Sequence, residues 1–134
     1  MKVSALLLGL SLAIPGISSA QEDCTNASDQ STLNQCAGKS YAKVDAELNA
    51  IYGQIRGRLK GDPETAKLLV VAQRAWVNFR DAECTFSSSL NKGGSMYPMV
   101  VSGCKEEITQ TRIKDLQTYL NCKAEDGGCP MPMK

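Results

Sequence analysis

The sequence of 134 residues contains no histidine. Histidine is the most common general base, it activates serine and cysteine nucleophiles, and it is a frequent zinc ligand. The sequence also has no Cys-x-x-Cys spacing, so it supports neither a thioredoxin-like redox pair nor a zinc ribbon. These absences favour a binding protein over an enzyme, and we predict no cofactor and no metal.

An excess of charge of one sign is also lacking, because 15 basic residues balance 14 acidic ones. A balanced chain has no overall electrostatic attraction for nucleic acid or for an anionic membrane. Aromatic residues make up only 5% of the chain, fewer than a sugar-cleaving cleft normally uses. A hydrolase with two catalytic carboxylates is therefore the least favoured alternative.

The first twenty residues have the composition of a secretory signal peptide. Lys2 supplies the positive start, and Ala5–Ile17 is apolar but too short to span a bilayer comfortably. Small residues at positions 18–20 precede an expected cleavage before Gln21, and no cysteine follows directly for lipid attachment. We therefore predict a signal peptide over residues 1–20 and a secreted or periplasmic protein without a membrane span.

A long helix is predicted first in the mature chain. Apolar residues recur at helical spacing from Leu33 to Leu59, and Ser31 or Thr32 can cap the start. Gly61 can end the helix in a left-handed conformation. Gly53 and Gly57 lie inside it and could allow close approach of a neighbouring helix.

A second long helix follows after a short link. Asp62 is its predicted cap, Pro63 suits the first helical position, and the pattern continues to about Ser88. Because the link is short, we expect the two helices to form an antiparallel hairpin. A third helix is predicted from after Gly103 to near Cys122.

Two segments disfavour regular structure. Residues 87–103 are rich in Ser, Gly and Pro, which predicts a long loop between the second and third helices. Residues 123–134 predict a loop-like tail. The expected fold is all-α, with an antiparallel hairpin of two long helices, a third helix and disulfide staples, in a single domain over residues 21–134.

All six cysteines follow the predicted signal peptide, which favours disulfides in an oxidising compartment. The hairpin places four of them at one end and two at the other. The preferred pairing is Cys24–Cys36, Cys84–Cys104 and Cys122–Cys129. The sequence also allows a crossed alternative, with Cys36–Cys84 and Cys24–Cys104.

The stretch Ala72–Cys84 contains the only Trp and an adjacent Arg-Asp pair. Helical spacing places six apolar residues on one face: Leu69, Ala72, Trp76, Phe79, Phe86 and Leu90. We predict that Trp76 and Phe79 fill the core of the hairpin. Arg80 needs partners for its five donors, and Asp81, Glu83 and loop carbonyls are available. We predict a structural role for this motif, with contact between Arg80 and a partner protein as the alternative.

These residues carry a resemblance to a known family. The chain resembles the LprI-like lysozyme inhibitor family, small exported helical proteins formerly grouped as a domain of unknown function. The matching elements are Leu48-Asn49-x-x-Tyr52, Ala72-Gln73-x-Ala75-Trp76-x-x-Phe79-Arg80-Asp81-x-x-Cys84, Gly93-Gly94-Ser95, Thr109-x-x-Arg112-x-x-x-Leu116, and Cys24, Cys36 and Cys104. The resemblance implies a small helical domain, export, disulfides and inhibition of lysozyme.

The segment Lys92-Gly93-Gly94-Ser95 is the predicted partner-binding loop. A protruding loop can enter an enzyme cleft, and Lys92 would suit the catalytic carboxylates of a lysozyme. The sequence equally allows a simple turn between helices. The predicted function is a non-catalytic exported protein that occludes lysozyme. The alternative is an envelope interaction or structural protein with a different partner, such as a toxin.

Overall fold

A computed structural model describes residues 24–123 and 125–131, so the predicted signal peptide lies outside the described residues. The described chain forms α1 (Gln30–Arg58), α2 (Pro63–Ser87), the short 3-10 helix η1 (Ser89–Asn91) and α3 (Tyr97–Asn121). No strand occurs in these residues, which confirms the all-α prediction. None of the described helices is both long and apolar enough to cross a membrane.

Aspartate caps begin the first two helices. The Asp29 carboxylate accepts a hydrogen bond from the Thr32 backbone N–H at 2.9 Å, and Asp62 accepts one from the Thr65 N–H at 3.1 Å. These hydrogen bonds hold the pKa of both carboxyls below the usual range. The Asp62 cap is as predicted, whereas the first helix is capped by Asp29, not by Ser31 or Thr32.

The first helix ends differently from the prediction. Leu59 is its C-cap, with its backbone N–H bonded to the Ile55 carbonyl, and Gly61 does not have a positive φ. Gly53 and Gly57 face open space, because nothing would lie within 4 Å of a Cβ added at either position. The predicted close approach of a helix at these glycines is therefore wrong.

The loop between α2 and α3 is shorter than predicted. It covers residues 88–96, because α3 already begins at Tyr97, with Pro98 in its first turn. A proline is compatible with that position, since the first backbone N–H groups of a helix have no partner within the helix. Pro98 thus marks the start of α3, and Gly103 lies inside that helix, so neither residue belongs to the loop.

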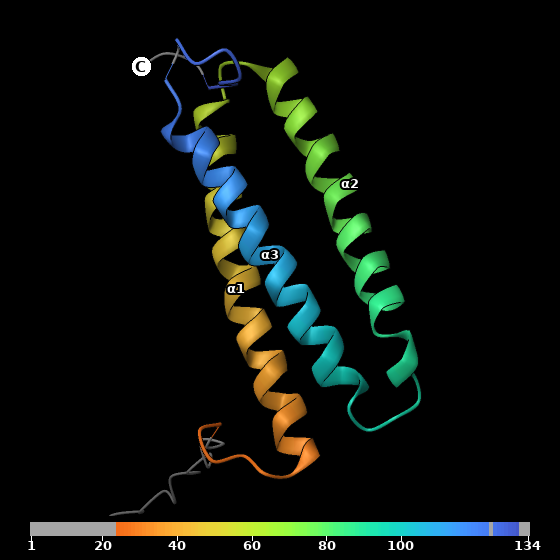
Figure 1. Cartoon of the computed structure of the whole chain (residues 1–134). Helices are drawn as coiled ribbons and strands as arrows, with labels where there is room; N and C mark the ends of the chain where they lie inside the picture. Colours follow the sequence, from red (N-terminus) through yellow and green to blue (C-terminus); the bar gives the residue numbers. More distant parts are fainter. Residues whose placement is uncertain (1–23, 124, 132–134) are drawn as a thin grey trace, which may run out of the picture.

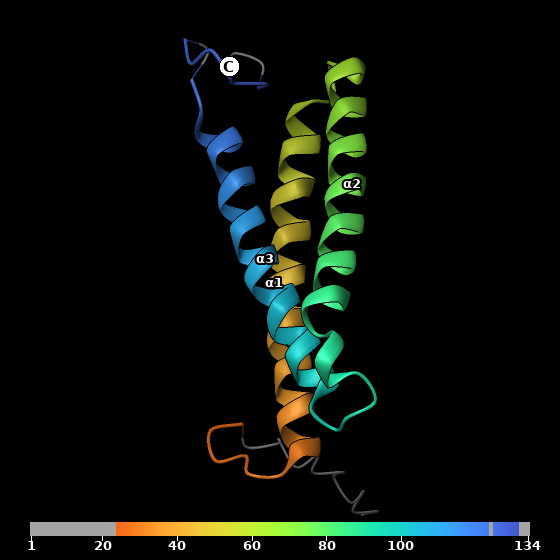
Figure 2. The ribbon, with the colours of Figure 1, turned by 45° about the vertical axis from the view of Figure 1, so that its right-hand side comes forward.

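The three long helices form an antiparallel arrangement with unequal contacts (Figures 1 and 2). α1 and α2 run in opposite directions, and α3 returns parallel to α1. The most extensive packing is between α1 and α3, and α2 contacts α3 less. Within the described chain, the backbones of α1 and α2 approach each other closely at few points, so the hairpin is loosely packed.

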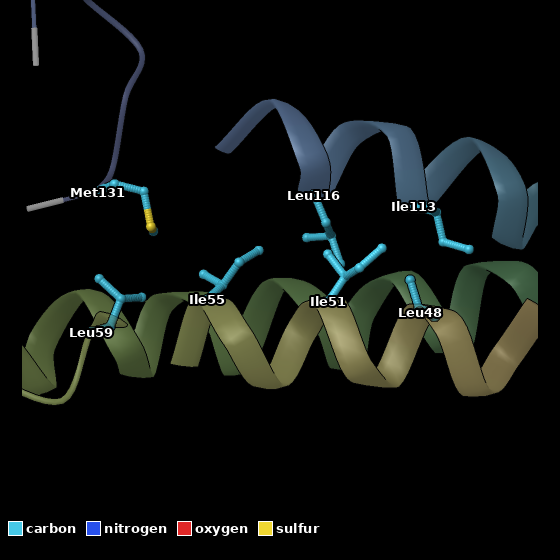
Figure 3. Close-up of a cluster of buried hydrophobic side chains, with 7 residues drawn as sticks. All are labelled: Leu48, Ile51, Ile55, Leu59, Ile113, Leu116 and Met131. Atoms are coloured by element: carbon cyan, nitrogen blue, oxygen red, sulfur yellow. The ribbon is translucent and has the colours of Figure 1, made fainter. Parts of the chain in front are cut away.

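The hydrophobic core lies between α1, α3 and the tail (Figure 3). Its buried members are Leu48, Ile51, Ile55, Leu59, Ile113, Leu116 and Met131. None of them belongs to α2, which contributes only partly buried apolar residues, namely Ala66, Leu69 and Trp76. Met131 covers one end of the core, so the described part of the tail packs on the helices.

The predicted apolar face of α2 is largely exposed. Phe79 is 57% exposed, Phe86 75% and Leu90 99%, while Trp76 is partly buried. The buried residues of α2 are Gln73, Arg80 and Cys84. The prediction that Phe79 fills the hairpin core is therefore wrong, because polar residues of α2 face the other helices.

Three disulfides join the pairs preferred from the sequence. Cys24–Cys36 attaches the segment before α1 to that helix, and Cys84–Cys104 joins the end of α2 to α3. Cys122–Cys129 closes the tail beyond α3. No free cysteine occurs among the described residues, so the crossed alternative is excluded.

We predict that Leu116→Ala lowers the free energy of unfolding by about 3 kcal/mol, because it leaves a cavity in the core. Leu116 is 0% exposed, whereas Leu68 of α2 is 69% exposed. The matched change Leu68→Ala should therefore cost less than about 1 kcal/mol. Urea denaturation followed by helical circular dichroism measures both. Equal losses would show that the face of α2 containing Leu68 is part of the core.

Candidate functional site

Arg80 is the centre of the contacts that hold α2 against α1. It is 6% exposed, and its Nη1 donates to the Asp45 carboxylate of α1 at 3.0 Å. Its Nε donates to the adjacent Asp81, also at 3.0 Å. The guanidinium carbon lies 5.5 Å from the Tyr41 ring centre and 5.1 Å from that of Trp76. Arg80 is thus held by Asp81, as predicted, and by Asp45, with no ion pair to Glu83.

The charges of this cluster stabilise one another. Burial alone would lower the pKa of Arg80, but hydrogen bonds to Asp81 and Asp45 and nearby negative charge raise it. Burial would raise the pKa of Asp81, but hydrogen bonds from Arg80 and Lys105 outweigh it and lower that pKa. Burial raises the pKa of Tyr41. Asp81 is therefore a fixed carboxylate, poorly suited to donate a proton.

Gln73 and Arg112 form a second polar connection, this time between α2 and α3. Arg112 Nε donates to Gln73 Oε1 at 3.1 Å. The Arg112 guanidinium also lies 5.9 Å from the Trp76 ring centre. Trp76 therefore contacts two guanidinium groups, one from its own helix and one from α3, and such contacts are favourable for the ring.

The predicted partner-binding loop is exposed over all of Lys92–Ser95. Gly93 adopts a φ of +83°, a conformation that residues with a Cβ rarely take. The Asn34 side chain of α1 donates to the Ser95 carbonyl at 2.9 Å, and the Gly94 N–H donates to the Asn91 carbonyl at 2.9 Å. The loop is thus ordered by its own turns and by one contact to α1.

Large apolar side chains surround this loop. Phe86 and Leu90 precede it and are 75% and 99% exposed, and Met96 follows it at 46%. The Cys84–Cys104 disulfide, with Cα atoms 5.6 Å apart, joins the two helices on either side. Exposed apolar residues around a rigid loop are a feature of protein-binding surfaces.

The sequence interpretation missed the partners that Arg80 and Gln73 find in other helices. Asp45 and Tyr41 lie one helical turn apart on α1, and Tyr41 Oη donates to Asp45 Oδ1 at 3.3 Å. That spacing was a usable signal, because an aromatic ring and a carboxylate on one face can bind a guanidinium together. Lys105 completes the cluster, with its Nζ 3.2 Å from Asp81 Oδ1.

Comparison with known proteins places this chain in a family. Residues 21–116 match the family model described as Lysozyme inhibitor LprI. The chain belongs to the LprI family. The uncharacterized protein R02472 of Rhizobium meliloti (strain 1021) is 37% identical over 134 residues, which cover 90% of this chain and 96% of that protein.

The uncharacterized protein YecT of Escherichia coli (strain K12) is a second relative in this comparison. It is 35% identical over 121 residues, covering 77% of this chain and 75% of YecT. No solved structure matches the chain. Four of the residues that carried the LprI resemblance connect α2 to the other helices, namely Gln73, Trp76, Arg80 and Arg112.

We predict that Arg80→Met costs about 2 kcal/mol of stability, because it leaves the Asp45 and Asp81 carboxylates without their shared cation. The exposed Arg74 of the same helix is the matched control, and Arg74→Met should leave stability almost unchanged. Urea denaturation measures both variants. Equal stability of the two variants would mean that the Arg80 cluster makes no net contribution to the free energy of unfolding.

The variant Arg80→Met should also change the pKa of Asp81. The folded-state pKa of Asp81 is depressed, so its stabilising contribution is present above its unfolded pKa and is lost as the pH falls through the folded pKa. In Arg80→Met the Asp81 pKa should rise towards its ordinary value and remain slightly low because Lys105 is still near. Carboxyl-carbon NMR titration reports it directly. An unchanged pKa would assign the depression to Lys105 alone.

Proposed function

We propose that this protein inhibits lysozyme by inserting the loop at residues 88–96 into or over the active-site cleft. Membership of a family described as lysozyme inhibitors supports the target. The observation that carries the position of the site is the exposure of Phe86, Leu90 and Met96 around Lys92–Ser95. Occlusion needs neither turnover nor a cofactor.

The loop is already ordered, which favours binding without a conformational change. The Cys84–Cys104 disulfide and the bond from Asn34 to Ser95 order the loop before any partner binds. A loop that is already ordered loses less conformational entropy on binding. Gly93 and Gly94 have no side chains, so the tip of the loop is narrow, as entry into a cleft requires.

Charge adds a specific contact. Lysozymes cleave glycosidic bonds with acidic side chains in the cleft. The exposed ammonium group of Lys92 would lie near those carboxylates, while Leu90 and Met96 would pack on the cleft walls. Apolar contacts would supply most of the affinity, and Lys92 would fix the register.

Export is part of the same proposal. A signal peptide over residues 1–20 would direct the chain to the periplasm or the outside of the cell, where lysozyme is met. Three disulfides in the described chain fit such an oxidising compartment.

The test is a lysozyme assay with purified protein at equimolar and higher ratios. We expect the wild type to slow lysis of cell-wall suspensions by a chicken-type or goose-type lysozyme. The triple change Leu90→Ser, Lys92→Ser and Met96→Ser should weaken inhibition by at least about tenfold, since a tenfold loss needs only about 1.4 kcal/mol. Gly93 is kept, so that the turn still forms.

The matched control removes similar groups elsewhere. Leu68→Ser, Val71→Ser and Lys114→Ser replace two exposed apolar residues of α2 and one lysine of α3, away from the loop. This variant should inhibit like the wild type, and both variants should keep the helical circular dichroism. Equal losses would place the site outside the loop. No inhibition by the wild type would refute lysozyme as the target and favour another exported partner, such as a toxin.

A further inference from the structure

A continuous groove runs between α1 and α2. Three adjoining hollows of about 650, 440 and 380 Å³ form it, open to solvent. The first two are lined from both helices, and the third extends along α1 alone. All three include Arg56, and neighbouring hollows also share Val70, Tyr52 or Lys60. The groove extends from Arg80 towards the link between the helices, and it exists because α1 and α2 do not pack closely.

Positive charge is concentrated along this groove. Arg56, Lys60, Lys67 and Arg74 line it, and all four are exposed. Within the described part of the chain none of the four forms an ion pair. Asp45 is the single acidic residue among the lining residues, and its charge is already matched by Arg80. The groove therefore attracts anions although the whole chain is nearly neutral.

The uncharged lining contains both apolar and polar residues. The apolar ones are Leu48, Leu59, Pro63, Ala66, Val70 and Val77. Asn49, Asn78 and Tyr52 present amide and hydroxyl groups to the hollow beside Arg74. Leu48 also borders it but is only 2% exposed, so it offers little apolar surface. The exposed cations lie beside these amide and hydroxyl groups. This combination suits a ligand rich in hydroxyl and anionic groups.

The shape indicates a linear ligand. The stretch of α1 from Asn49 to Arg58 spans about 14 Å, enough for a few sugar residues in a row. Small-molecule sites usually enclose most of the ligand, whereas this groove is open along one side. Gly53 and Gly57 leave open space where side chains would narrow the path.

We propose that the groove between α1 and α2 binds a linear anionic polysaccharide whose sugar residues carry carboxylates. The guanidinium groups of Arg56 and Arg74 pair with the carboxylates, and the lysines near the link add attraction. Asn49, Asn78 and Tyr52 bond to the hydroxyls. The inference does not depend on lysozyme inhibition, because the groove lies outside the loop at residues 88–96.

Oligogalacturonate is the probe, and neutral dextran of similar length is its uncharged control. Binding is measured by calorimetry and by NMR shifts of the groove residues. We expect the wild type to bind oligogalacturonate, to ignore dextran, and to lose affinity as salt is added, because salt screens exposed charges. The double change Arg56→Gln and Arg74→Gln should weaken binding by at least about tenfold.

A second double change, Lys43→Gln and Lys114→Gln, removes the same net charge outside the groove and should alter binding less than about twofold. The groove variant should also keep any lysozyme inhibition shown by the wild type, so the two proposals fail separately. Absence of oligogalacturonate binding would overturn the inference, as would equal weakening in both double variants. Tighter binding of poly-glutamate or single-stranded DNA would also overturn it, in favour of another class of anion.

Discussion

The contact of Trp76 with two guanidinium groups is the interaction on which the position of α2 depends. Arg80 contacts the ring from within α2 and bonds to Asp45 of α1, while Arg112 contacts it from α3 and bonds to Gln73. The buried core cluster consists of residues from α1, its cap Leu59, α3 and the tail, and none of its buried members comes from α2. Helix α2 is therefore attached by directed polar contacts and a disulfide, with apolar packing in a secondary role.

This mode of attachment leaves two faces of α2 available. Directed contacts fix a helix at a few points, whereas a close-packed apolar seam would exclude all space between helices. One consequence is the groove, which remains open beside Arg56 and Arg74. The other is the apolar stripe through Phe79 and Phe86, which leads to the loop at residues 88–96. The polar attachment thus explains both candidate binding surfaces.

Sequence reasoning succeeded where the signal is local. The Asp62 cap followed by Pro63 and the short link between α1 and α2 depend on neighbouring residues. The cysteine pairing then followed from the antiparallel hairpin that this short link implies. It failed where the answer depends on the helix opposite. Helical spacing identified an apolar stripe on α2, but it could not show that polar Gln73 and Arg80 would find partners in other helices and occupy the buried side instead. Phe79 therefore lies on the exposed side of α2.

The groove was missed for a different reason, which also separates it from the loop. A net charge is a sum over the chain, and it conceals a local excess when acidic residues lie elsewhere. Arg56 lies in the last turn of α1 and Lys60 follows that helix, while Lys67 and Arg74 are seven positions apart on α2 and share a helix face. Only the antiparallel folding of α1 and α2 brings these four residues to one groove. A basic lysozyme would be repelled by such a groove. The proposed lysozyme contact therefore belongs to the loop at residues 88–96, and the proposed polysaccharide contact belongs to the groove.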